Sequence, residues 1–148
     1  MAVYAYNRRA SFDYELLEKF EAGIELTGEE VKPIRNGRMS LEGSFVLISN
    51  KEAQLMNATI PPYQPNNTSK DYDPLRSRKI LLTKKEIAHL ESIQKNSNLT
   101  VVPISVYNKG RKIKVEIALA KGKKKRDKRE TIKKRETDRE IRREYKGR

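Results

Sequence analysis

Apolar and polar residues alternate over a long stretch near the N-terminus. Apolar residues occupy the even positions from Phe12 to Leu26, and only Glu18 interrupts them. A period of two residues is typical of a strand with one buried face. A helix is the rival interpretation, because a single helical face would collect Leu16, Leu17, Phe20 and Ile24. Gly23 and the length of the alternation favour the strand.

A short helix is predicted directly after this strand. Thr27 is followed three residues later by Glu30, which is the pattern of a capping box, so we interpret Glu30 as a cap residue. The helix should continue to about Arg35 and end at Asn36–Gly37. Pro33, at the sixth helical position, removes one backbone hydrogen bond, so the helix should be short or begin with an irregular turn.

A second capping box, formed by Thr83 and Glu86, predicts another helix. This helix should end near Asn96 to Asn98, and its buried face should contain Ile87, Leu90 and Ile93. Residues 64–78 form a polar loop interrupted by prolines. A loop of this length in a small domain indicates a functional surface or a mobile segment.

Apolar runs bounded by turn residues predict further strands. Asn50–Lys51 should form a hairpin turn, and Asn108–Arg111 should form another. The strands that flank these two turns are predicted at Phe45–Ser49, Ala53–Ala58, Leu99–Tyr107 and Lys112–Ala120. The last strand should point Ile113, Val115, Ile117 and Leu119 inward. A mainly β chain with five or six antiparallel strands and two or three short helices fits an OB-type barrel best.

Basic residues are concentrated at the C-terminal end. Residues 121–148 hold 15 of the 33 Lys and Arg against 6 acidic residues, and so carry +9 of the net charge of +13. We therefore predict a barrel over residues 1–120 and a basic tail over residues 121–148. The tail has too few apolar residues to fold alone, so it should be disordered when free and become helical on a polyanion such as RNA. A solvated tail that aids solubility is the alternative.

Motifs for catalysis or metal binding are not found in the sequence. Cysteine is absent and histidine occurs once, at His89, which we interpret as a surface residue. Asp71 and Asp73 are the only close pair of aspartates, and beside Pro74 they are typical of a turn. We expect no enzyme activity, no cofactor and no metal site. Since the sequence contains neither a membrane-spanning run nor a signal peptide, we expect an intracellular protein without a membrane partner.

Basic clusters recur near the predicted strand ends and loops, where side chains reach phosphates most easily. They are Arg8–Arg9, Lys32/Arg35/Arg38, Arg76/Arg78/Lys79, Arg111/Lys112/Lys114 and Lys121/Lys123/Lys124/Lys125.

Several segments resemble the SmpB family, the tmRNA-binding (SsrA-binding) proteins of bacterial ribosome rescue. They occur in the family's order over nearly the whole chain and are Asn7–Ala10, Phe20–Ile24, Gly28–Lys32, Asp73–Leu82, Val101–Pro103 with Tyr107, and Ala120–Glu130. The resemblance implies an OB-type barrel that binds the tRNA-like domain of tmRNA. It also implies a basic tail that enters the empty mRNA channel of a stalled ribosome.

The resemblance places the family's RNA-contact residues at Glu21, Leu81 and Lys114. Two alternatives stay open, since Glu21 fits the solvent face of the first strand and Leu81 fits the core. Together with the basic clusters, these positions give the expected RNA-binding set of Arg8, Arg9, Glu21, Lys32, Arg76, Arg78, Lys79, Leu81, Lys114, Lys121, Lys123 and Lys124. In the tail, the residues expected to contact the ribosome are Arg126, Asp127, Lys128, Arg129, Arg135, Arg139 and Arg142.

Two positions depart from the family pattern. Pro33 stands where many family members have Ser, and Arg126 stands where His or Tyr is common. A guanidinium plane can stack on a base as a ring does, so we expect Arg126 to replace the ring.

The resemblance implies a cytoplasmic, monomeric adaptor that binds tmRNA. Its further partners would be the decoding centre and mRNA channel of the small ribosomal subunit, and elongation factor Tu with the alanylated tmRNA. The alternatives are a structural ribosomal protein and a small hydrolase that uses Asp71 and Asp73.

Overall fold

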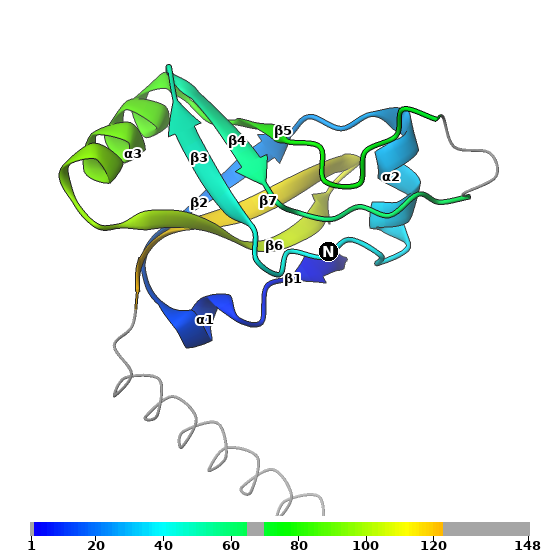
Figure 1. Cartoon of the computed structure of the whole chain (residues 1–148), viewed down its shortest axis with the longest axis horizontal. Helices are drawn as coiled ribbons and strands as arrows, with labels where there is room; N and C mark the ends of the chain where they lie inside the picture. The colour runs from blue at the N-terminus through cyan, green and yellow to red at the C-terminus, as the bar shows by residue number, and fades with distance from the viewer. Residues whose placement is uncertain (1, 65–69, 123–148) are drawn as a thin grey trace, which may run out of the picture.

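Strands dominate the computed structural model of the chain, which describes residues 2–64 and 70–122. Three helices interrupt the strands (Figure 1). In chain order the elements are β1 Val3–Tyr6, α1 Ala10–Asp13, β2 Tyr14–Ile24, α2 Gly28–Arg35, β3 Phe45–Ser49, β4 Glu52–Met56, β5 Arg78–Leu81, α3 Lys84–Asn96, β6 Thr100–Lys109 and β7 Lys112–Gly122.

The strands form a closed barrel in which every neighbouring pair is antiparallel. Their order is β1-β6-β3-β4-β5-β2-β7, and a further pairing of β6 with β7 closes the ring. Closure pairs the edges that an open sheet would expose. The predicted OB-type antiparallel barrel is therefore confirmed for the described residues.

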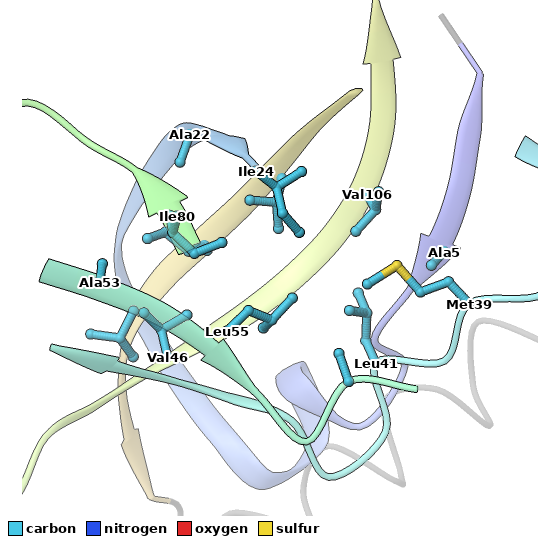
Figure 2. Packing of buried hydrophobic residues seen from close by; sticks show 14 of the residues in the cluster. Ala5, Ala22, Ile24, Met39, Leu41, Val46, Ala53, Leu55, Ile80 and Val106 are labelled. Atoms are coloured by element: carbon cyan, nitrogen blue, oxygen red, sulfur yellow. The ribbon is translucent and has the colours of Figure 1, made fainter. Parts of the chain in front are cut away.

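The interior of the barrel is filled by the inward residues of the strands (Figure 2). On β7, Val115, Ile117 and Leu119 are at most 3% exposed, and Ile113 packs against them at the margin. The predicted inward face of this strand is confirmed. The turn Asn50–Lys51 is also confirmed, because both residues adopt the positive φ angles, 51° and 63°, that a tight hairpin between β3 and β4 requires.

The long N-terminal alternation belongs to a strand, as predicted, but its two halves face different clusters. The β2–β7 register shifts between Leu16 and Glu18, and such a bulge moves following side chains to the other face. Before the shift, Leu16 packs with Ala10 in a small cluster outside the main core. After it, Phe20 packs against the main core. The predicted start at Phe12 is wrong, because residues 10–13 form α1 and β2 begins at Tyr14.

Both capping boxes are present. Glu30 accepts the backbone N–H of Thr27 at 2.9 Å, and α2 runs to Arg35 despite the buried Pro33 inside it. At α3, the Glu86 carboxylate and the Thr83 hydroxyl each accept the other residue's backbone N–H, at 3.0 and 3.2 Å. Both predicted helices are confirmed.

Two short elements at the N-terminus, β1 and α1, were not predicted. Each has four residues, which is too short to show a period. Among the described residues, no helix combines the length and apolar composition needed to cross a bilayer.

Candidate nucleic-acid interface

Three of the expected RNA-binding residues lie together on the outer face of the barrel. Leu81 on β5 pairs with Gly23 on β2, and Gly23 pairs with Lys114 on β7. Lys114 in turn pairs with Tyr107 on β6. Residues directly opposite one another share a face, so these four form one row across four strands. Glu21, two positions before Gly23 on β2, lies on the same face.

Leu81 is an exposed apolar side chain in this row. It is 48% exposed, whereas the preceding residue, Ile80, points into the core. Gly23 leaves the space that Leu81 occupies, since a Cβ atom added at Gly23 would lie 3.2 Å from Leu81 Cδ1. The core alternative for Leu81 is therefore wrong.

A hollow of about 380 Å³ adjoins the row. Its apolar lining comes from Ile24, Leu26, Val31, Leu81 and Ile113, together with Gly23. The four charged side chains that line it are all basic, namely Arg35, Arg111, Lys112 and Lys114. The Arg35 Nη2 atom donates to the carbonyl oxygen of Arg111 at 3.4 Å, which joins the end of α2 to the β6–β7 turn. An apolar floor with a basic rim suits a ribose or base flanked by phosphates.

Glu21 does not stand free on the strand surface. The Tyr107 hydroxyl donates to its Oε2 atom at 2.5 Å, and Lys109 Nζ lies 3.0 Å from its Oε1 atom. These two contacts, Tyr107 first, lower the pKa of Glu21 and outweigh the opposing effect of burial. Burial, and next the Glu21 hydrogen bond, raise the pKa of Tyr107. Glu21 is thus a fixed anion that orients Lys109 beside the basic rim.

Removing the Tyr107 hydroxyl should change the titration of Glu21. In Tyr107→Phe we expect the pKa of Glu21 to rise toward its ordinary value of 4.5, because the largest stabiliser of the carboxylate is lost. Since folding lowers this pKa, the group's contribution to stability is present above 4.5 and is lost as the pH falls. Carboxyl chemical shifts followed by NMR measure the change. Tyr72→Phe is the matched control, since its hydroxyl bonds the Ile60 carbonyl instead, and equal Glu21 titration in both variants would contradict the assignment.

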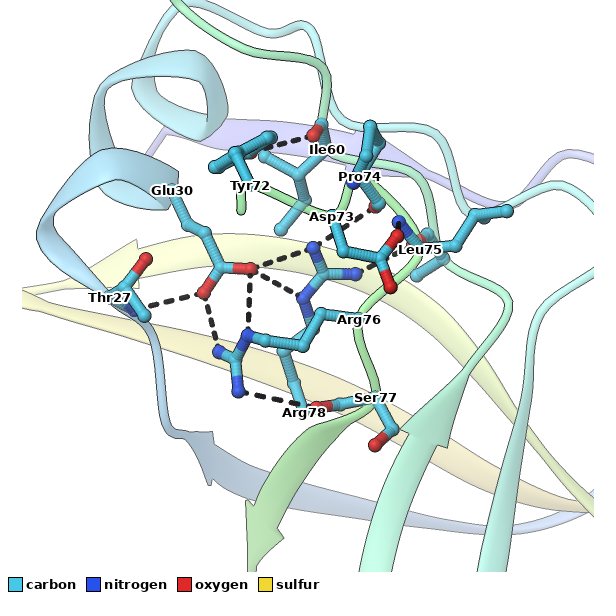
Figure 3. A network of polar contacts seen from close by, with 11 residues as sticks. Thr27, Glu30, Ile60, Tyr72, Asp73, Pro74, Leu75, Arg76, Ser77 and Arg78 are labelled. Carbon is cyan, nitrogen blue, oxygen red and sulfur yellow. Dashed lines mark hydrogen bonds and ion pairs between the residues drawn. The ribbon is translucent and has the colours of Figure 1, made fainter. Parts of the chain in front are cut away.

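The structure removes Arg78 from the predicted set of RNA-binding residues. Its side chain is fully buried, and its Nε atom donates to Glu30 Oε2 at 2.8 Å (Figure 3). Its other nitrogens donate to the carbonyl oxygens of Ala58 at 2.7 Å and Pro74 at 3.1 Å. With its donors directed at protein acceptors in the interior, Arg78 is not available to a phosphate on the surface.

Arg76 belongs to the same network. Its Nη2 atom lies 2.6 Å from Glu30 Oε1, although its side chain is 41% exposed. Burial would raise the pKa of Glu30, but hydrogen bonds from Arg76, Thr27 and Arg78 outweigh it and lower the pKa. Glu30 is therefore both the predicted cap and the centre of an ion-pair network that ties β5 to α2. Arg76 pairs with Glu30 in this network, and this geometry does not support the expected role of Arg76 in binding RNA.

The remaining expected residues lie elsewhere on the surface. Arg8 and Arg9 are exposed beside α1, where Arg9 Nε lies 3.4 Å from Asp13 Oδ2. Lys121 lies near that end of the barrel, opposite Glu15. Lys79 is exposed on β5, and Lys32 is exposed on α2. The expected residues that lie outside the described residues are Lys123, Lys124, Arg126, Asp127, Lys128, Arg129, Arg135, Arg139 and Arg142.

Two further sequence interpretations can be compared with the structure. Asp73 Oδ1 accepts the backbone N–H of Leu75 at 2.9 Å, which confirms its turn role beside Pro74. His89 is exposed, as predicted, with its Nε2 atom 3.1 Å from Glu18 Oε2. In residues 2–64 and 70–122, no group of three or more His, Cys, Asp or Glu side chains is arranged to hold a metal ion.

The role of Tyr107 was not predicted from the sequence. The predicted four-residue turn Asn108–Arg111 would place Tyr107 opposite Lys112. That turn is too long by two residues, because β6 continues to Lys109 and pairs Tyr107 with Lys114. The pairing of Tyr107 with Glu21 needs β2 as well, and Glu21 lies 86 residues away in the chain.

Comparison with known proteins adds to this geometry. A family model described as "SmpB protein" matches residues 4–147. An "SsrA-binding protein" of Sulfurihydrogenibium sp. is 52% identical over 145 residues, which cover 98% of this chain and 95% of the relative. One from Mesoplasma florum is 51% identical over 97% of both chains. A solved structure described as "tmRNA-SmpB: a journey to the center of the bacterial ribosome" contains a similar chain, with a TM-score of 0.67 and 43% identity over 81% of this chain and 84% of that one.

Proposed function

Since this chain belongs to the SmpB family, we propose that it is a tmRNA-binding adaptor of trans-translation. In this function the barrel binds the tRNA-like domain of tmRNA and delivers it to the A site of a stalled ribosome. The protein contributes binding and positioning and has no catalytic step of its own. The partners are tmRNA, the small ribosomal subunit, and elongation factor Tu with the alanylated tmRNA. The adaptor acts in the cytoplasm as a monomer.

The observation that carries this proposal is the hollow beside Leu81 and Lys114. Its four cations can neutralise neighbouring phosphates, and release of the counterions from those phosphates favours binding. The exposed Leu81 side chain offers a contact for a ribose or an unstacked base. Support also comes from the similar chain seen with tmRNA. The match to that chain covers 81% of the length of this protein.

The second part of the proposal concerns the basic tail. The barrel strand β7 ends at Gly122, shortly beyond the predicted boundary, and residues 123–148 follow it. These residues combine many cations with few apolar side chains, so we expect them to fold only against RNA. In this function they probe the empty mRNA channel, and Arg126 stacks on a base of the decoding centre.

The barrel interface is tested by Lys114→Ala in the full chain. We expect weaker binding to the tRNA-like domain and a loss of about 0.7 to 0.9 from the slope of log K against log salt, because one phosphate contact is removed. Binding is measured by fluorescence anisotropy over a series of salt concentrations. Lys95→Ala, on the last turn of α3, is the matched control and should leave the slope unchanged. Equal slopes for wild type and Lys114→Ala would show that Lys114 contacts no phosphate.

A further inference from the structure

A cluster of two cations and one aromatic ring lies beyond the hollow, at the end of α2. The Lys32 Nζ atom lies 5.6 Å from the centre of the Tyr63 ring, and the Arg38 Cζ atom lies 5.9 Å from it. Both distances are within the range of a cation–π interaction. Tyr63 lies after β4, whereas Lys32 and Arg38 lie within and just after α2. Three side chains from two separate segments therefore meet here.

The Tyr63 ring allows the positively charged side chains of Lys32 and Arg38 to lie close together on the surface. Two neighbouring cations repel each other, and the negative face of the ring offsets part of that repulsion. Arg38 is held in a second way, because its Nη1 atom donates to the Tyr63 carbonyl oxygen at 3.2 Å. Gly37, with a φ of 73°, provides the turn that brings Arg38 back toward the helix. The two cations are thus positioned before any ligand arrives.

The two cations of this cluster are accessible to an anionic ligand. Within residues 2–64 and 70–122, neither Lys32 nor Arg38 forms an ion pair with a carboxylate. Lys32 and Arg38 are exposed, and Tyr63 is 38% exposed. Preorganised cations without a protein anion are suited to bind a phosphate group, whose oxygens accept several charge-assisted hydrogen bonds.

The cluster lies next to the hollow along α2. Arg35 lies between Lys32 and Arg38 in sequence and lines the hollow, where it contacts the carbonyl oxygen of Arg111. In Figure 1, α2 lies beside the tip of the β6–β7 hairpin and away from α3. The basic side chains therefore form a path from Lys114 across α2 to Arg38. A phosphate backbone that enters at the hollow meets the cluster next.

We propose that Lys32 and Arg38 form a phosphate clamp, positioned by Tyr63, that extends the RNA-binding surface over α2. This proposal rests on the proposed function, since the occupant is the phosphate backbone of the same structured RNA that fills the hollow. Tyr63 is a positioning residue and contributes through the two cations, not by stacking on a base. The clamp adds two phosphate contacts to those made at the hollow.

The test uses the full chain and a transcribed tRNA-like domain of tmRNA, with binding measured over a series of salt concentrations. The double variant Lys32→Gln with Arg38→Gln should lower the salt slope by about 1.4 to 1.8, which corresponds to two phosphate contacts. Tyr63→Leu should weaken binding about three- to tenfold, since it removes two cation–π contacts. Tyr63→Phe keeps the ring and should bind like wild type.

A double-mutant cycle separates positioning from stacking. In the Lys32→Gln, Arg38→Gln background, Tyr63→Leu should have no further effect, whereas a persistent loss would show that the ring contacts RNA directly and would overturn the positioning role. An unchanged slope in the double variant would overturn the clamp, even if Tyr63→Leu disturbed the fold. If Lys114→Ala behaves as expected while the clamp variants do nothing, only the clamp is wrong. If Lys114→Ala also leaves the slope unchanged, the proposed surface itself fails.

Discussion

We expect Glu30→Ala to lower the free energy of unfolding by about 3 to 5 kcal/mol, because it leaves the Arg78 guanidinium buried without its anion. Arg78 is 0% exposed and Glu30 is 1% exposed, so water cannot replace the lost partner. The ion pair between Arg76 and Glu30 contributes less to stability, since the Arg76 side chain is 41% exposed to water. Urea unfolding followed by circular dichroism measures the change.

A matched control separates the ion pair from the helix cap. Glu86→Ala removes the equivalent carboxylate from the capping box of α3, where no buried arginine of the described residues depends on it, and should cost only about 0.3 to 1.5 kcal/mol. Similar losses in the two variants would mean that the buried pair contributes little beyond the cap.

The same network predicts a pH dependence of stability. Folding lowers the pKa of Glu30 below its ordinary value of 4.5. The carboxylate's contribution is therefore fully present above that value and is lost as the pH falls through the folded-state pKa. Below pH 4.5 the wild type should lose more stability than Glu30→Gln. Parallel acid-unfolding curves for the two proteins would contradict this sign.

Reversing the charge of the tail should abolish tagging while leaving tmRNA binding nearly intact. Arg135, Arg139 and Arg142 would lie on one stripe of a helix at 100° per residue. Replacing all three by Glu removes three positive charges from the face that should meet ribosomal RNA and places three negative charges there, a change of six charge units, and like charges repel. The measurements are tmRNA affinity of the purified variant and peptide tagging on stalled ribosomes in a reconstituted translation system.

A tail variant of equal charge tests whether the stripe matters. Replacing Lys133, Lys134 and Arg143 by Glu changes the net charge by the same amount, but these residues would lie off the stripe. This control should retain more tagging than the stripe variant. Equal loss of tagging would show that total charge, and not a helical face, determines entry into the channel. Unimpaired tagging by the stripe variant would remove the tail from the mechanism.

The sequence alone determined the features that depend on neighbours a few residues apart. The capping boxes at Thr27 and Thr83, the hairpin at Asn50–Lys51 and the inward face of β7 all follow from local hydrogen bonds or from the two-residue period of a strand. The OB-type barrel followed from the number and spacing of these elements, and the family was recognisable from its ordered segments.

Only the tertiary structure decided which of the basic and apolar side chains face the solvent. Arg78 and Lys79 are neighbours in one cluster, yet Arg78 is buried, because the buried carboxylate of Glu30, 48 residues earlier on α2, pairs with its guanidinium. Leu81 is exposed because it lies on the outer face of the barrel, and the lack of a side chain at Gly23 on the partner strand leaves room for it there. The shift at Leu16 and Glu18 likewise depends on the partner strand β7. A period reveals which residues share a face, but the partner that covers or pairs with that face comes from a distant part of the chain.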